Sequence, residues 1–154
     1  MANPLKMLKL KPTGFQFIEE LPIQAPPKKV WASLLKVEKW FRFDPDPKKA
    51  SKHTFEATAG SRWVSTTWEG NTIFHGTVTY VEPGKLLRLA GQVGATHLPV
   101  TTVVIFELQP QADGKTTLLR LGQRTFGLID ADLKTRAANM WKRLLPQLKE
   151  LAEK

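Results

Sequence analysis

The side chains that could take part in proton transfer are three histidines, His53, His75 and His97, and a single tyrosine, Tyr80. The chain has no cysteine, which excludes disulfides, thiol nucleophiles and thiolate metal ligands together. The histidines are too far apart in sequence to form a local zinc-binding motif. We therefore expect neither a sequence-local metal site nor a cofactor.

His75 stands in an alternating stretch that is typical of a strand. Period-two alternation places Phe74, Gly76, Val78 and Tyr80 on one face of that strand and His75 on the other. Because the first set is bulkier and more aromatic, we expect it to face the interior and His75 to face solvent. An inward Tyr80 could donate a hydrogen bond to a ligand, or it could be a core tyrosine whose hydroxyl is satisfied by the protein.

Two further residues are candidates for contact with a ligand. His97 lies in the glycine-containing stretch 91–100, a connection long enough to form the rim of a cavity, although no acid neighbours it in sequence. Trp63 and Trp68 are five residues apart, so one strand would place them on opposite faces. Of the two tryptophans, we expect Trp68 to point inward.

The elements that must position these residues are predicted from the hydrophobic pattern. Residues 15–23 alternate as a first strand, and the prolines at 26–27 begin a helical region that ends near residues 37–40. Two Asp-Pro steps then impose a connecting segment. Short β-rich runs between turns over 53–125 predict five or six antiparallel strands.

The final segment, about 130–153, is predicted to be a long amphipathic helix. Its apolar face is formed by Leu133, Ala137, Met140, Trp141, Leu144, Leu148 and Leu151. Pro146 interrupts this pattern, and we expect it to kink the helix near residues 142–146.

The net charge of +9 is concentrated at the two ends of the chain. Residues 1–52 carry eleven Lys or Arg against five acids, residues 53–110 carry three against four, and residues 111–154 carry nine against five. No lysine block or RNA-binding aromatic motif accompanies the charge. A solvated basic surface is the favoured interpretation, and an acidic protein or nucleic-acid partner is the alternative.

The order of elements indicates an α+β domain with a curved antiparallel sheet of about seven strands around the C-terminal helix. The sequence resembles the START-like, or SRPBCC, superfamily with its helix-grip fold, and within it the branch of the heat-shock-protein ATPase activator homologues and polyketide cyclases. The resemblance rests on residues 23–26, 30–31, 34–35, 76–78, 81–83, 86–87 and 140–141. A single START-like domain over 14–154, preceded by a flexible basic arm over 1–13, is expected.

The resemblance implies a hydrophobic cavity between the sheet and the last helix. The residues expected to line it are Trp68, Phe74, Val78, Tyr80, His97, Phe106, Met140, Trp141 and Leu144.

The leading hypothesis is a cytoplasmic, non-catalytic protein that binds a small apolar or amphipathic molecule in this cavity. A cyclase or hydrolase that polarises a carbonyl with Tyr80, His97 or an inward arginine is the second hypothesis. A chaperone cofactor or ribosome-associated factor that uses the basic surface is the third. The sequence contains no run long enough to be a membrane span.

Overall fold

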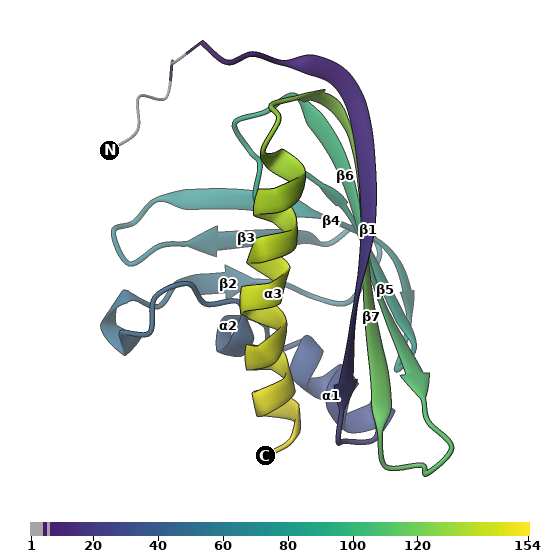
Figure 1. The fold of residues 1–154 in the computed structure, drawn as a ribbon. Helices are drawn as coiled ribbons and strands as arrows, with labels where there is room; N and C mark the ends of the chain where they lie inside the picture. The colour runs from purple at the N-terminus through teal and green to yellow at the C-terminus, as the bar shows by residue number, and fades with distance from the viewer. Residues whose placement is uncertain (1–4, 6) are drawn as a thin grey trace.

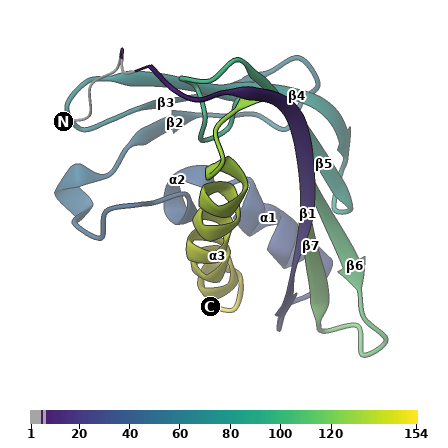
Figure 2. The same cartoon turned by 45° about the horizontal axis from the view of Figure 1, so that its top comes forward.

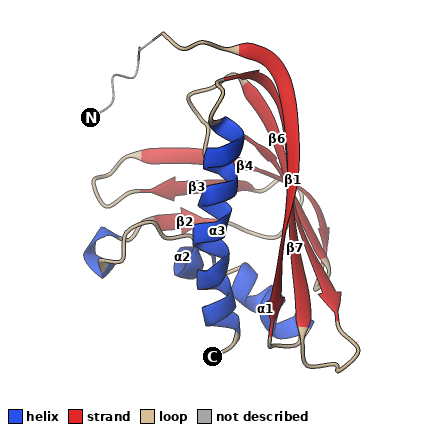
Figure 3. Cartoon of the chain, in the orientation of Figure 1, coloured by secondary structure: helices blue, strands red, loops and turns tan. Residues whose placement is uncertain are grey.

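The structure, a computed structural model, describes residue 5 and residues 7–154. In these residues one sheet curves around one long helix (Figures 1 and 3). The strands are β1 (Lys11–Ile23), β2 (Lys52–Thr54), β3 (Arg62–Thr66), β4 (Thr72–Glu82), β5 (Leu86–Gly91), β6 (Val100–Pro110) and β7 (Thr117–Ile129). The α-helices are α1 (Pro27–Leu34), α2 (Val37–Trp40) and α3 (Leu133–Ala152), and Pro47–Lys49 forms a short 3₁₀ turn.

The described strands form a seven-stranded sheet in the order β1-β7-β6-β5-β4-β3-β2, and every neighbouring pair is antiparallel. From β2 to β7, strands that follow one another in the sequence are also neighbours in the sheet, and β1 pairs with β7 at the opposite edge from β2. Figure 2 shows the sheet arching over α3, and Figure 1 shows α1 and α2 beside the C-terminal half of that helix. The predicted helix-grip fold is confirmed.

The first strand begins at Lys11, within the span expected to be a basic arm. Residues 1–4 and 6 of that expected arm lie outside the described residues. Helix α3 begins at Leu133 and continues through Pro146 without interruption to Ala152. The kink expected near Pro146 stays a prediction.

The concave face of the sheet and the apolar face of α3 enclose a packed aromatic core. Trp141 of α3 lies against Phe106 of β6 with ring centroids 5.7 Å apart, and Trp40 packs on Phe106 at 6.1 Å. Leu144 and Leu148 of the same helix are fully buried. The centre of the domain is therefore filled by side chains, and its hollows lie toward the edges.

Two β-bulges overturn the faces that were predicted for β4. Trp63 pairs with Gly76 and Val64 with Phe74, so His75 is an extra residue in the ladder; Thr79 is the extra residue of a second irregularity. A bulge shifts the inward and outward alternation by one residue.

The side-chain positions in β4 follow from these bulges. His75 is 6% exposed, whereas Phe74 and Tyr80, which were expected to face inward, are 47% and 42% exposed. Val78 is buried, as expected. The predicted solvent-facing position of His75 was wrong.

The two tryptophans were also assigned the wrong way round. Strand β3 ends at Thr66, so Trp68 lies in the following turn. The alternation of side chains between the two faces of a strand therefore does not apply to Trp68. Trp63 is 1% exposed and Trp68 is 57% exposed. Trp63 is the inward residue of the pair.

Candidate functional site

A hollow of about 240 Å³ lies between the segment that follows α2 and the concave surface of strands β2 to β4. We call it the histidine pocket. It is lined by Phe41, Arg42, Phe43, Asp44, Lys49, Ala50, Ser51, His53, Ser65, Thr67, Trp68, Glu69, Ile73 and His75. Three Phe or Trp side chains and nine polar or charged residues therefore surround the same space, so the pocket is more polar than a typical small-molecule site.

His75 is held in the wall of the pocket by one hydrogen bond and two aromatic neighbours. Its Nε2 lies 2.8 Å from Ser65 Oγ. Its ring lies 4.5 Å from the Trp63 ring and 5.4 Å from Phe41, between centroids. Its Nδ1 is buried and has no hydrogen-bond partner in the described structure. A buried polar atom in that state calls for an explanation, because most such atoms are paired.

His53 lines the same hollow, and its hydrogen bond to Trp63 fixes the position of its ring proton. The indole N–H of Trp63 donates to His53 Nδ1 at 3.0 Å, so Nδ1 is the acceptor nitrogen. The proton of the neutral ring is then on Nε2, since a neutral imidazole carries only one. Burial lowers the pKa of His53, and the carboxylate of Glu38 opposes that effect only in part.

Burial lowers the pKa of His75 to about 4, and the neighbouring His53 adds to the shift by repulsion. The two rings are stacked with their centroids 6.2 Å apart, so a charge on one disfavours a charge on the other. His75 is consequently neutral at neutral pH.

The depressed pKa predicts acid sensitivity of the fold. His75 has a pKa of about 4 when folded and about 6.5 when unfolded, so the unfolded chain binds the extra proton between these values. Stability is therefore full above pH 6.5 and falls as the pH drops toward 4, by up to about 3 kcal/mol. Urea unfolding at a series of pH values measures this slope.

The variant His75→Gln supplies the comparison for that measurement, because it lacks the titrating ring. Carboxylates such as Asp113 and Glu153, whose pKa values are lowered by hydrogen bonds, contribute to acid sensitivity in both proteins. The contributions of these carboxylates cancel when the pH dependence of unfolding free energy in His75→Gln is subtracted from that of the wild type. An equally steep slope in His75→Gln would show that the slope does not come from His75.

Arg42 brings a cationic group whose charge is not matched within the described structure. Its Nε and Nη2 are buried without a hydrogen-bond partner. The nearby carboxylate of Asp44 is already engaged, because it accepts from the Asp46 backbone N–H and lies 3.9 Å from Lys49 Nζ. Arg42 is half-buried, and leaving its two buried nitrogens without an acceptor is costly; a ligand that accepts from them would reduce the cost.

The Ser65–His75 contact has the composition of a nucleophile and base but lacks the other requirements. A serine nucleophile is activated by a histidine whose second nitrogen is oriented by a third group. Here that second nitrogen has no partner in the described structure, and the low pKa makes His75 a weak base. The arrangement is suited to donating hydrogen bonds to a bound molecule rather than to activating Ser65.

A second hollow, of about 300 Å³, lies between the sheet and the N-terminal half of α3. We call it the helix-side hollow; Met140 and Ala137 line it, and Phe43 lines both it and the histidine pocket. Its buried polar groups are satisfied by one another. Trp141 Nε1 donates to Gln123 Oε1 at 2.7 Å, and Gln123 Nε2 donates to Thr125 at 3.2 Å.

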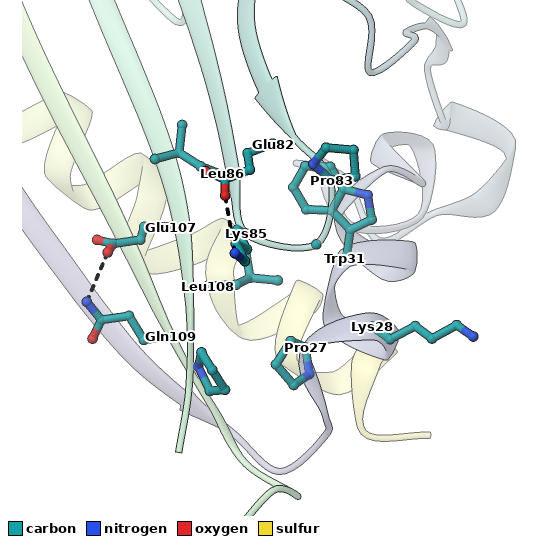
Figure 4. A pocket seen from close by; sticks show the side chains of 12 residues that line it. Pro27, Lys28, Trp31, Glu82, Pro83, Lys85, Leu86, Glu107, Leu108 and Gln109 are labelled. Carbon is teal, nitrogen blue, oxygen red and sulfur yellow. Dashed lines mark hydrogen bonds and ion pairs between the residues drawn. The ribbon is translucent and has the colours of Figure 1, made fainter. Parts of the chain in front are cut away.

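An open groove of about 650 Å³ runs between α1 and the turn that joins β4 to β5. Figure 4 shows Trp31 of α1 beside Pro83 of that turn. Three of its charged groups are engaged within the protein: Lys85 Nζ lies 3.3 Å from Glu82, and Glu107 accepts from Gln109 at 3.0 Å (Figure 4). The fourth, Lys28, is exposed. The groove thus offers shape but no unpaired buried group, which distinguishes it from the histidine pocket.

The structure distributes the nine predicted site residues over several places. Trp68 lines the histidine pocket and Met140 lines the helix-side hollow. Four belong to the packed core: Val78, Phe106, Trp141 and Leu144. Three are exposed: Phe74, Tyr80 and His97. Their role as ligand contacts stays a prediction.

Sequence reasoning missed Arg42, His53 and Ser65, which the fold brings to one pocket. One feature of the sequence bears on the position of Arg42. The two Asp-Pro steps that follow it prevent the helix from continuing. The return of the chain to β2 then places Arg42 opposite the strands. Among the described residues there is no group of three or more metal-ligating side chains placed to hold an ion.

The fold defines the class of protein: a START-like, helix-grip domain with hollows on the concave side of its sheet. Residues 24–153 match the family model described as "Activator of Hsp90 ATPase homolog 1-like protein". The chain belongs to this family, within the SRPBCC superfamily that the sequence resembled.

Solved structures share the fold at low sequence identity. Protein CV1439 from Chromobacterium violaceum is 21% identical, with a TM-score of 0.66, over 90% of this chain and 97% of that one. Mll3558 from Rhizobium loti is 17% identical, with a TM-score of 0.71, over 92% and 99%. DynU16, a protein in the dynemicin biosynthetic locus, is 18% identical, with a TM-score of 0.64, over 88% and 46%. A search of curated proteins gave no match.

Proposed function

We propose that the protein binds a small amphipathic molecule in the histidine pocket and that it does so without catalysing a reaction. The observation that carries the proposal is a pocket lined by Phe41, Phe43 and Trp68 whose wall residues Arg42 and His75 have buried polar atoms without a hydrogen-bond partner in the described structure. The fold supports it, since START-like domains commonly bind hydrophobic ligands. The volume of about 240 Å³ lies just below the range of about 300–1,000 Å³ that holds drug-sized molecules, which favours a ligand of one or two rings.

Affinity in this pocket would come from burial of the ligand's apolar surface against Phe41 and Trp68. Orientation would come from the polar groups of Arg42, His53 and His75. This division of roles gives a function to three of the six charged or titratable side chains in the wall.

An enzyme acting on a carbonyl group is less well supported. Tyr80 is exposed, with the Arg88 guanidinium 5.0 Å above its ring, and His97 is exposed on the loop between β5 and β6. Neither residue lines the histidine pocket. A cytoplasmic location remains part of the proposal, and within the described residues no helix is long and apolar enough to cross a membrane.

Filling the pocket tests the proposal directly. The neutral probe 2-naphthamide should bind the wild type with saturation in calorimetry, and Ala50→Phe should abolish binding because the new ring occupies the hollow. The matched control is Gln109→Phe, which places the same ring in the open groove and should leave binding unchanged. Equal binding by wild type and Ala50→Phe would contradict the proposed location.

A further inference from the structure

We infer that the histidine pocket recognises a ligand that carries an anionic oxygen group, such as a carboxylate, and that Arg42 is the residue that pairs with it. This inference rests on the proposed function and adds the chemical class of the ligand.

The buried polar atoms of pocket-wall residues that lack a partner in the described structure are donors or can become donors. Arg42 contributes Nε and Nη2, both of which can only donate. His53 contributes its Nε2–H, because Trp63 occupies its other nitrogen. These groups together require an acceptor, and a carboxylate is an acceptor at both oxygens.

His75 can join this set without losing its existing contact. The hydroxyl of Ser65 can donate to Nε2 or accept from it, so the position of the ring proton is free to respond to a ligand. When Ser65 donates, the proton lies on Nδ1, the buried atom that has no partner in the described structure. An anionic oxygen beside Nδ1 would favour that tautomer, and a side chain with 6% exposure has little access to water instead.

The charges around the pocket leave a place for one negative group near Arg42. Asp44 and Lys49 face each other at 3.9 Å and offset one another. Glu69 also lines the hollow, but it lies in the exposed turn between β3 and β4 and no ion pair joins it to Arg42 in the described structure. A ligand carboxylate would therefore be the counter-ion that Arg42 lacks, and a guanidinium can bind it through two nitrogens.

The test compares two probes that differ in charge but have nearly the same shape, 2-naphthoate and 2-naphthamide. We expect the wild type to bind naphthoate about tenfold more tightly or better, since a charge-assisted bond is stronger than a neutral one. In Arg42→Gln the naphthoate affinity should fall about tenfold, while naphthamide affinity should change by less than about twofold. Arg88→Gln, which removes the same charge outside the pocket, should change neither.

Loss of stability in Arg42→Gln is not expected to cause the loss of binding, because Nε and Nη2 of Arg42 make no hydrogen bond within the described structure. Arg42→Gln should therefore be at least as stable as the wild type without ligand. The Gln147 side-chain N–H donates to the Arg42 backbone carbonyl at 2.8 Å. This hydrogen bond does not involve the Arg42 side chain, so the substitution keeps it.

The outcomes separate this inference from the proposed function. Equal binding of both probes to the wild type, or equal loss of both in Arg42→Gln, would overturn the anionic ligand and leave the binding pocket standing. If neither probe binds, the proposed function fails for such ligands, and titration with acetate followed by ¹⁵N NMR decides the anion site on its own. Saturable shifts at Arg42 Nε and His75 Nδ1 would support it, and their absence would overturn it.

Discussion

Replacing Trp63 by alanine should lower the free energy of unfolding by about 3–5 kcal/mol, the usual cost of removing a large buried aromatic side chain. Trp63 is 1% exposed and packs against Phe41 at 4.7 Å and His75 at 4.5 Å between ring centroids. It also donates its indole N–H to His53. Chemical denaturation of wild type and variant measures the loss.

The matched control for this prediction is Trp68→Ala, because Trp68 is the same residue type five positions away. It is 57% exposed, and Lys49 Nζ lies 5.9 Å from its ring centroid. Its loss should cost less than about 1 kcal/mol. Similar losses in both variants would mean that the inward and outward positions of the two tryptophans are not as described.

A third variant, Trp63→Phe, separates packing from hydrogen bonding. It keeps most of the apolar contact but removes the donor to His53 Nδ1. The lost hydrogen bond should cost about 1 kcal/mol. NMR of His53 should then report a change in its tautomer, because nothing else in the described structure is bonded to that nitrogen.

Replacing Gly91 by alanine is the second prediction with a large expected effect, a loss of about 3 kcal/mol in unfolding free energy. A Cβ at residue 91 would lie 2.5 Å from the Gly76 Cα and 2.7 Å from the His75 carbonyl oxygen. Both are backbone atoms of the bulged strand β4, so they cannot move aside as a flexible side chain would. The substitution should displace the bulge and, with it, His75.

Gly122→Ala provides the control, since it makes the same change in another strand of the sheet. A Cβ at residue 122 would meet nothing within 4 Å. Its unfolding free energy should stay within about 0.5 kcal/mol of wild type, or rise, because alanine loses less backbone entropy than glycine on folding. A Gly91→Ala protein as stable as Gly122→Ala would contradict the close approach of β4 and β5.

The fold could be predicted from the sequence because its signals are long and periodic. The apolar stripe from Leu133 to Leu151 predicts one long helix, and the turns at Pro83–Gly84 and around Gly114 separate strands at short intervals. Gly84 and Gly114 both have positive φ, as such turns require. These features do not depend on knowing which side of any one strand faces inward.

The site could not be predicted in the same way because it depends on two local departures from regularity. The bulge at His75 reverses the faces of β4, and a bulge leaves no periodic signal in the sequence. The early end of β3 at Thr66 moved Trp68 into a turn. Arg42 enters the pocket only through the tertiary path of the segment after α2.

Two of the aromatic residues that were expected to line the cavity, Phe106 and Trp141, are fully buried in the core. Phe106 and Trp141 pack edge to face, and Trp40 covers Phe106 from the helical region. The space that remains is divided between the helix-side hollow and the histidine pocket, and the latter lies between the chain that follows α2 and strands β2 to β4.

A crystal structure of the protein grown with 2-naphthoate is the most direct test of the claim that the histidine pocket is the ligand site. We predict electron density for the naphthalene ring between Phe41 and Trp68, within contact of His53 and His75. Density in the helix-side hollow or in the groove beside Trp31, with the histidine pocket empty, would contradict the account.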